Sequence, residues 1–439
     1  MLARTLNNAV DLSARLSGVL IFSAMLLALA DTFQLIEATH IATILAWTFV
    51  ALELKNLSAK QRRLILILSG AGLLFAGWAW LQGGDLSLLD ILSEHIKLAM
   101  LLAAVNFIRL VSRLEPAPDR KGVRSFLTTL GGMHFFSSVA NFSSVLMVGE
   151  QLYRSERLTA LSQIILARGF SLAVLWSPFL SILPMTLDKV PGSNIYAVYP
   201  FTITLACLGL LLTLVESRLV RNEELSCYAG YPIKSSTLLL PAVLISSVLL
   251  TAWLYPSLPT LGVVALLALL APFALLSLRN GVGDATRRAG RHIIERLPDA
   301  RGEIALFLTA GLLAAGVKAC IATGLLELPF AETSANTAAF VLLAVVILGY
   351  AGIHQFAVVA ICMGFFADIT TTPTLMAIAY IMGTSLAMSG SIFSGLNFIL
   401  QARFRCSTRE ILAHNSVYTL IMLISTLVLL YLLEYLGVR

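Results

Sequence analysis

Residues 169–173, GFSLA, recur as GTSLA at residues 383–387, which is 214 positions further along the chain. Each copy is followed at the same spacing by a serine, Ser177 in the first and Ser391 in the second, and then by a phenylalanine. Two related stretches half a chain apart indicate an internal duplication. In an apolar protein, such a duplication is typical of secondary transporters, whose substrate sites lie where the repeats meet.

A second pair of related stretches surrounds two histidines. GMHFFSSVA at residues 132–140 resembles GIHQFAVVA at residues 352–360, with an offset of 220 residues. We predict that both pairs of stretches line one substrate site. An inverted repeat then places His134 close to His354, near Ser177 and Ser391.

The composition indicates a membrane protein. The 439 residues are 58% hydrophobic and only 12% charged, about half the charged share of a soluble domain, and the mean hydropathy is +0.88. The five cysteines are scattered without the spacing of metal ligands. We predict an all-α polytopic membrane protein in the lipid bilayer, without a cofactor and without a nucleic-acid partner.

Apolar stretches near the roughly 20 residues that a spanning helix needs recur along the chain. Eleven of them are predicted spans: 17–34, 36–54, 64–82, 89–111, 158–187, 196–217, 236–255, 259–278, 303–325, 373–402 and 410–436. Basic residues cluster between them at 55–63, 113–124, 154–157, 218–221, 279–301 and 403–409. The positive-inside rule places all of these clusters in the cytoplasm.

Two further segments are predicted to be re-entrant hairpins. Segment 122–152 has basic residues on both sides, so it enters from the cytoplasm and returns there, with its tip near the Gly131-Gly132 pair. Segment 334–367 has acidic flanks and enters from outside, with its tip near residues 349–352. Entry from opposite faces is the relation that an inverted repeat requires.

This topology divides the chain into four parts. They are an extra N-terminal helix at 1–35, repeat 1 at 36–217, a linker at 218–235 and repeat 2 at 236–436. The N-terminus is expected in the cytoplasm and the C-terminus in the periplasm of a bacterial inner membrane. The loop at 279–302 is expected to form an amphipathic helix on the cytoplasmic surface.

Helix-breaking residues interrupt the two spans that carry the GxSLA stretches. In span 158–187, Pro178 follows Trp176-Ser177, and in span 373–402 the run Ser389-Gly390-Ser391 contains a glycine. Broken helices that face re-entrant hairpins bind substrates and ions in transporters of this kind. The alternative is a kink that serves helix packing alone.

Polar residues concentrate at the hairpins and the breaks, where freed backbone groups attract ions. The predicted substrate site comprises His134, Ser137, Ser138, Asn141, Arg168, Ser171, Ser177, His354, Gln355, Ser385, Ser389 and Ser391. The predicted ion-coupling residues are Ser143, Ser144, Thr384 and Asp368. The alternatives are ordinary ones: serines that bond their own helix, histidines that pack, and an aspartate that caps a helix.

One arginine stands out among the charged residues within the spans. Arg168 directly precedes the repeated glycine, about ten residues into its span. A guanidinium there can hold a carboxylate through two hydrogen bonds, whereas the alternative is snorkelling toward the interface. The excess of intramembrane cations and neutral polar groups over acids favours an anionic substrate.

The layout of hairpins and broken helices resembles the ion transporter superfamily across nearly the whole chain. This group includes divalent anion/sodium symporters, arsenite permeases and the membrane subunits of tripartite carboxylate transporters. Residues 140–144 and 368–372 are similar to the Ser-Asn-Thr hairpin tips of the symporters, and residues 176–178 and 389–391 to their Thr-Pro-Pro-type breaks. The resemblance implies a homodimer in which hairpins and broken helices move, as in an elevator, against a fixed scaffold.

The sequence therefore predicts a secondary active transporter of a small, carboxylate-like organic anion, driven by a Na⁺ or H⁺ gradient, and not an enzyme. It contains no Walker A loop, nucleophile elbow or zinc pair. Three alternatives stay open. One is an exporter of arsenite or another oxyacid on the same scaffold, and another is a membrane subunit that needs a partner chain. The third is an intramembrane enzyme or lipid-handling protein that uses His134 and His354.

Overall fold

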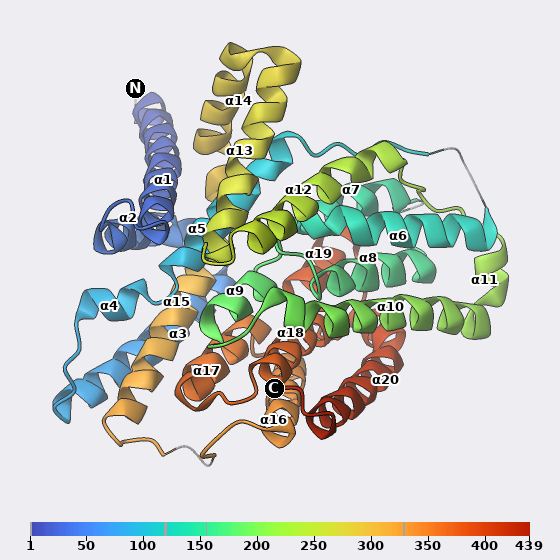
Figure 1. The fold of residues 1–439 in the computed structure, drawn as a ribbon. Helices are drawn as coiled ribbons and strands as arrows, with labels where there is room; N and C mark the ends of the chain where they lie inside the picture. The colour runs from blue at the N-terminus through green and yellow to red at the C-terminus, as the bar shows by residue number, and fades with distance from the viewer. Residues whose placement is uncertain (1, 118–120, 155, 328–329) are drawn as a thin grey trace. The chain divides into compact units, whose positions relative to one another are not determined.

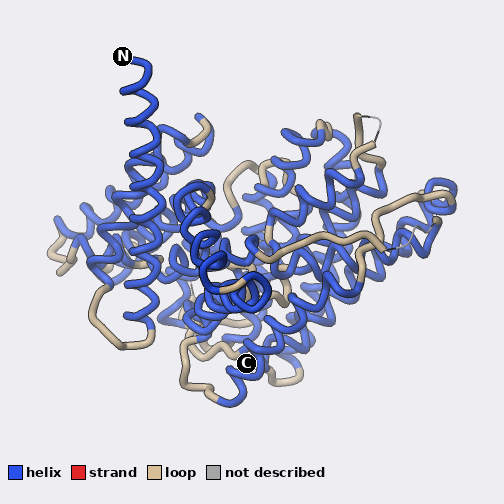
Figure 2. Tube along the Cα trace, turned by 90° about the horizontal axis from the view of Figure 1, so that it is seen from above, coloured by secondary structure: helices blue, strands red, loops and turns tan. Residues whose placement is uncertain are grey.

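A computed structural model describes residues 2–117, 121–154, 156–327 and 330–439. Arg120, in the basic cluster at 113–124, lies outside the described residues. The described parts form helices joined by loops, with two isolated β-bridges (Figure 2). Eight of the described helices are long and apolar enough to cross a membrane. The protein is an all-α polytopic membrane protein, as its hydropathy predicts.

The chain folds into two compact units, and each unit draws on both predicted repeats. Unit 1 comprises Met1–Val111, Ser247–Pro329 and Ala360–Phe365, and unit 2 comprises Ser112–Ser246, Phe330–Val359 and Phe366–Arg439. The first part of each repeat therefore belongs to unit 1. The second part, which contains the predicted hairpin and the broken helix, belongs almost entirely to unit 2.

Unit 1 is built around a close pair of helices. Its elements are α1 (Leu2–Thr32), α2 (Thr39–Glu53), η1 (Leu54–Asn56), α3 (Ala59–Leu81), α4 (Leu88–Ser93), α5 (Ile96–Val105), η2 (Asn106–Leu110), α13 (Thr260–Asn280), α14 (Val282–Glu295), η3 (Leu297–Ala300) and α15 (Arg301–Ala322). Helices α3 and α15 lie side by side (Figure 1). A Cβ at Gly316 would lie 2.5 Å from the carbonyl oxygen of Gly72, so glycine permits this approach.

In unit 1, one predicted helix is present and one predicted span is divided. The segment 279–302 forms α14, the helix that its sequence predicts. The span predicted at 89–111 is not one helix, because it divides into α4, α5 and η2. The His95 ring beside this division hydrogen-bonds the Phe307 carbonyl through Nδ1 at 3.1 Å. A Cβ at Gly311 of α15 would lie 2.6 Å from the same ring. The glycine therefore leaves room for the His95 side chain.

Unit 2 contains the hairpins and the broken helices. Its elements are α6 (Gly122–Ala140), α7 (Phe142–Leu152), α8 (Ala160–Ala173), α9 (Ile182–Lys189), α10 (Ile195–Val220), α11 (Asn222–Ser226), α16 (Ala335–Tyr350), η4 (Ala367–Ile369), α18 (Pro373–Gly390), α19 (Gly395–Phe404) and α20 (Thr408–Tyr435). Two more helices, α12 (Ser235–Leu254) and α17 (Gln355–Phe366), have residues in both units. Helix α8 packs against α6 and α10, and α18 packs against α16 and α20 (Figure 1).

The tip of the first helix pair is not where glycine predicts it. Gly131 and Gly132 lie inside α6, and the chain turns at Asn141, between α6 and α7. Gly132 is small for a different reason, since a Cβ there would lie 2.8 Å from the Ile233 side chain. In the second pair, α16 ends at Tyr350 and α17 begins at Gln355, so the turn lies where the sequence predicts it, with Gly352 at a φ of 104°.

Candidate functional site

The two GxSLA stretches are in contact through their serines. The Ser385 hydroxyl of α18 donates a hydrogen bond of 2.7 Å to the Ser171 carbonyl of α8, and both residues are buried. The glycine two residues earlier packs on the first hairpin helix of its own repeat. A Cβ at Gly169 would lie 2.9 Å from Met133 in α6, and one at Gly383 would lie 3.0 Å from Val345 in α16. The two copies thus make equivalent contacts around one crossing point.

The serines at the two breaks also have equivalent partners. The Ser177 hydroxyl donates to the Ser138 carbonyl of α6 and accepts from the Phe179 backbone N–H at 3.1 Å. The Ser391 hydroxyl donates to the Gly349 carbonyl of α16 at 2.7 Å and accepts from the Phe393 N–H, again at 3.1 Å. Each serine therefore joins the end of a broken helix to the helix that leads into a hairpin tip.

The helix pair α6–α7 is called hairpin 1 and the pair α16–α17 hairpin 2. The tip of hairpin 1 has a strained backbone. Asn141 has φ 49° and ψ −147°, a conformation open almost only to glycine. Its Oδ1 accepts from the Phe142 N–H at 2.8 Å and so caps α7. The Ser144 hydroxyl donates to the Asn141 carbonyl at 2.6 Å and lies 2.9 Å from the Ser137 hydroxyl. Three of the predicted site residues, Ser137, Asn141 and Ser144, are therefore in one bonded group.

Hairpin 1 reaches the second break as well as the first. Phe142, the first residue of α7, stacks on Phe170 with ring centroids 4.8 Å apart. Gly395, the first residue of α19, lies against the Phe142 ring, because a Cβ at Gly395 would be 3.4 Å from the Cζ atom of Phe142. The N-termini of α7 and α19 are therefore neighbours. Both ends carry the positive pole of a helix dipole.

An asparagine that the sequence analysis does not select organises the second break. The Asn397 amide nitrogen donates to the carbonyls of Ser389 and Ser391, both at 2.9 Å, and more weakly to that of Met388 at 3.3 Å. Its Oδ1 is buried and has no hydrogen-bond partner among the described residues. The available signal is the position of Asn397, a polar residue three places after Ser394 in an otherwise apolar segment.

His134 has protein partners on both ring nitrogens. The Trp176 indole N–H, which can only donate, bonds Nε2 at 2.9 Å. Nδ1 therefore carries the proton and donates to the Gly169 carbonyl at 3.2 Å. The Phe135 ring packs edge-on against Trp176 at 5.5 Å. In this arrangement His134 is a neutral ring that links α6 to the first break, with neither nitrogen left for a substrate.

The second histidine is placed differently. His354 lies in the turn of hairpin 2, where its Nδ1 accepts from the Phe356 N–H at 3.3 Å. Gln355 is buried at the first position of α17. His134, in contrast, lies within α6, seven residues before the tip at Asn141. The pair of stretches offset by 220 residues is therefore not equivalent in structure, whereas the pair offset by 214 is.

Arg168 is fully buried in an ion pair. Its guanidinium donates to both carboxylate oxygens of Glu216 in α10, at 2.7 and 3.1 Å. It also donates to the His414 carbonyl at 2.5 Å and to Asn415 Oδ1 at 3.3 Å, and lies over the Tyr418 ring at 4.1 Å. It neither snorkels nor faces an open space. The carboxylate that it holds belongs to the protein, a partner 48 residues away that sequence spacing does not reveal.

The remaining predicted residues have local contacts. Thr384 donates to the Tyr380 carbonyl at 2.8 Å, and Ser389 donates to the Ser385 carbonyl at 3.2 Å, each within its own helix. Ser143 is half-buried at the start of α7, and Asp368 is exposed in η4. The structure brings Ser143 to the hairpin tip but leaves Asp368 on the surface.

Comparison with known proteins finds similarity among solved structures alone. No protein-family model matches the chain, and no curated protein matches it in sequence. Among solved structures, it is similar to the crystal structure of the YdaH transporter of Alcanivorax borkumensis, with a TM-score of 0.43 and 15% sequence identity over 96% of this chain and 98% of that chain.

Proposed function

We propose that this protein is a secondary active transporter of a small, carboxylate-like organic anion in a bacterial inner membrane, driven by a Na⁺ or H⁺ gradient. The observation that carries the proposal is the meeting of the two repeats in unit 2, where Ser385 bonds Ser171 and each break is joined to a hairpin. Non-helical backbone at membrane depth is tolerated only inside protein or beside a wet cavity. Two such breaks beside two tips favour a binding site.

The preference for an anion rests on the helix ends. The first residues of α7 and α19, Phe142 and Gly395, are in contact, so the positive poles of two helices converge. Freed N–H groups at such ends bind carboxylates and phosphates. The positive field is therefore assigned to the helix ends and not to Arg168, because Glu216 balances the charge of Arg168. It also favours a charged substrate over a neutral oxyacid.

The coupling ion is proposed to bind at the tip of hairpin 1. The hydroxyls of Ser143 and Ser144 lie there, close to the carbonyl of Asn141 that accepts from Ser144. Oxygen atoms of this kind are the ligands that Na⁺ and other hard cations use. Thr384 and Asp368 remain predicted ion-coupling residues from the sequence.

The interleaving of the repeats supports an elevator mechanism. The described breaks at 174–181 and 391–394 lie in unit 2, whereas the α3–α15 pair of unit 1 is closely packed. We propose that unit 2 moves and that unit 1 forms the fixed scaffold of a homodimer. The rival hypothesis of an intramembrane enzyme loses support, because both nitrogens of His134 are already bonded.

The test is uptake into proteoliposomes. Purified protein is reconstituted, and a panel of radiolabelled mono- and dicarboxylates, sulfonates and arsenite is offered with a Na⁺ gradient, with a H⁺ gradient and with neither. Gradient-driven uptake of a carboxylate, abolished by disrupting the tip with Asn141→Pro, is expected. Uptake of arsenite alone would favour the oxyacid alternative, and no flux of any compound under either gradient would exclude the proposal.

A further inference from the structure

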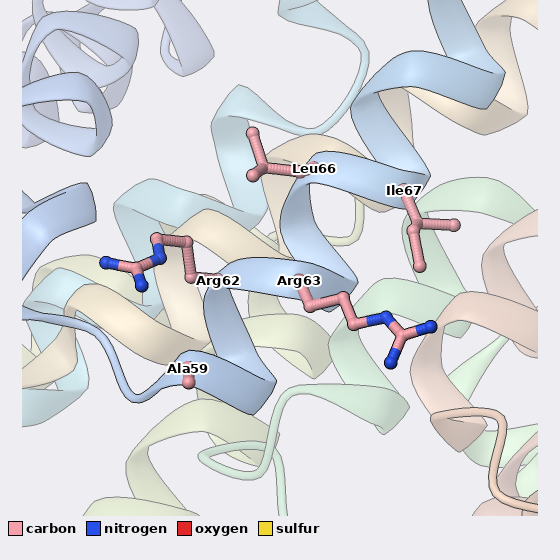
Figure 3. A pocket seen from close by; sticks show the side chains of 5 residues that line it. All are labelled: Ala59, Arg62, Arg63, Leu66 and Ile67. Carbon is pink, nitrogen blue, oxygen red and sulfur yellow. The ribbon is translucent and has the colours of Figure 1, made fainter.

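We propose that the start of α3 binds the headgroup of an anionic phospholipid from the cytoplasmic leaflet. A surface pocket of about 550 Å³ lies there, lined by Ala59, Arg62, Arg63, Leu66 and Ile67. Figure 3 shows the Arg62 and Arg63 side chains extending to opposite sides of the first turns of the helix, with Leu66 about one turn beyond Arg62 and Ile67 about one turn beyond Arg63. The pocket is thus cationic at one end and apolar at the other.

The two guanidinium groups are available to an anion. Arg62 and Arg63 are both exposed, and within the described part of the chain neither guanidinium has a hydrogen-bond or ion-pair partner. No acidic side chain lines the pocket. A guanidinium pairs with a phosphate through two parallel hydrogen bonds. The Ser58–Gln61 capping box fixes the first turn of α3, whose positive pole adds to the same field.

The apolar end of the pocket continues along the helix. Leu66 and Ile67 are 55% and 56% exposed, and Leu74, two turns further on, is 75% exposed. Only 28% of the spanning window of α3 is buried inside the protein. The opposite face, at Gly72, packs on Leu312 of α15. The exposed face is therefore a strip on which acyl chains can lie below a headgroup held by the arginines.

A lipid fits this face better than a second copy of the chain does. A two-fold symmetric contact would place the same patch on both partners, so unpaired arginines would meet unpaired arginines. The positive-inside rule places Arg62 and Arg63 at the cytoplasmic surface, where anionic lipids attract basic residues. Charge complementarity thus selects the acidic lipid.

The experiment measures lipid binding to the full-length protein by native mass spectrometry and by thermal stability in detergent. Phosphatidylglycerol is titrated against wild type, the double variant R62Q/R63Q and a matched control, R287Q/R291Q. The control removes the same charge from exposed arginines of α14. Because α14 is also expected at the cytoplasmic surface and attracts anionic lipid in general, we expect the control to lose only a small part of the binding, and the double variant to bind about tenfold more weakly. R62K/R63K, which retains the charge, should keep part of the binding.

Five outcomes would overturn the proposal. Four are equal binding by R62Q/R63Q and wild type, an equal loss in the α14 control, equal stabilisation by phosphatidylcholine, and the same stabilisation by inorganic phosphate without lipid, which would identify a site for a soluble anion. The fifth is a change in the oligomer mass of R62Q/R63Q with lipid binding intact, which would show that a second copy covers the face. None of these measurements depends on transport activity.

Discussion

The hydroxyl of Ser385 and the carbonyl oxygen of Ser171 are 2.7 Å apart, and the two residues hold the same position in the two GxSLA stretches. In unit 2, this bond joins α8 to α18. Each of these helices also packs, through the glycine two residues earlier, on a helix of the preceding pair: Gly169 on Met133 of α6 and Gly383 on Val345 of α16.

Replacing Ser385 with alanine removes this bond between α18 and α8. We expect Ser385→Ala to lower the free energy of unfolding by about 1 kcal/mol, the usual size of a hydrogen bond between membrane helices. Ser171→Ala is the matched control, because its carbonyl stays and its hydroxyl makes only a 3.4 Å contact with the Arg168 carbonyl. Denaturant unfolding in detergent measures both. Equal losses in the two variants would contradict the assigned direction of the bond.

Asn141 carries backbone strain that glycine relieves. We expect Asn141→Ala to destabilise the protein by about 1 kcal/mol, because alanine loses the cap on α7 while it still adopts the strained φ of 49° and ψ of −147°. Asn141→Gly loses the same cap, but glycine adopts this conformation without strain. The loss of stability should therefore be smaller for glycine than for alanine. The order of the two melting temperatures is the measurement. Alanine better tolerated than glycine would refute the strained tip.

Asn397 holds the second break together. Asn397→Ala removes the side-chain donor of the buried Ser389 carbonyl, whereas the carbonyls of Met388 and Ser391 keep bonds from Ser394, so we expect a loss of about 1–3 kcal/mol in stability. Gln401→Ala is the control, since this half-buried side chain caps the Ile392 carbonyl of the same segment at 2.8 Å. Its cost should be smaller. Thermal unfolding compares them, and an Asn397→Ala protein as stable as the Gln401 variant contradicts the assignment.

The Arg168–Glu216 pair is testable by a double-mutant cycle. Glu216→Gln leaves the buried guanidinium without its counter-charge, so we expect a loss of about 3–5 kcal/mol. Arg168→Met should cost a similar amount or less, because the Glu216 side chain is 23% exposed and can reach water. The double variant should recover part of the loss. If Arg168 instead served only a substrate, Glu216→Gln would be nearly neutral in the unliganded protein.

The stability of unit 1 should depend on pH through His292 in α14. Burial, with Arg109 and Arg296 nearby, lowers the pKa of this imidazole to about 4. Between that value and the unfolded pKa of about 6.5, the unfolded state binds more protons, so stability falls as the pH falls. Above pH 6.5 this contribution is complete. Melting temperatures from pH 8 to 4 should show a smaller decline for His292→Gln than for wild type.

Some contacts at the two breaks follow from signals in the sequence, because these signals are local. Pro178 and Gly390 lie at the two breaks, although Pro200, Pro241 and Pro272 lie inside continuous helices, so a helix breaker alone does not decide where a helix ends. The serines Ser177 and Ser391 have equivalent bonds in the structure, as their shared spacing implies. The Gly131-Gly132 pair predicts the tip about ten residues too early, because glycine serves both in turns and in close packing, and the turn lies at Asn141. Only the contact of Gly132 with Ile233 distinguishes the two uses.

The sequence by itself determined the membrane class and the positions of the two helix breaks, because hydropathy and backbone chemistry act over a few neighbouring positions. Only the tertiary structure decided which contacts the two GxSLA stretches make. It pairs Arg168 with Glu216, gives both ring nitrogens of His134 a hydrogen-bond partner and places Ser385 against Ser171. These pairings depend on how helices distant in the chain pack together, and no local pattern records that packing.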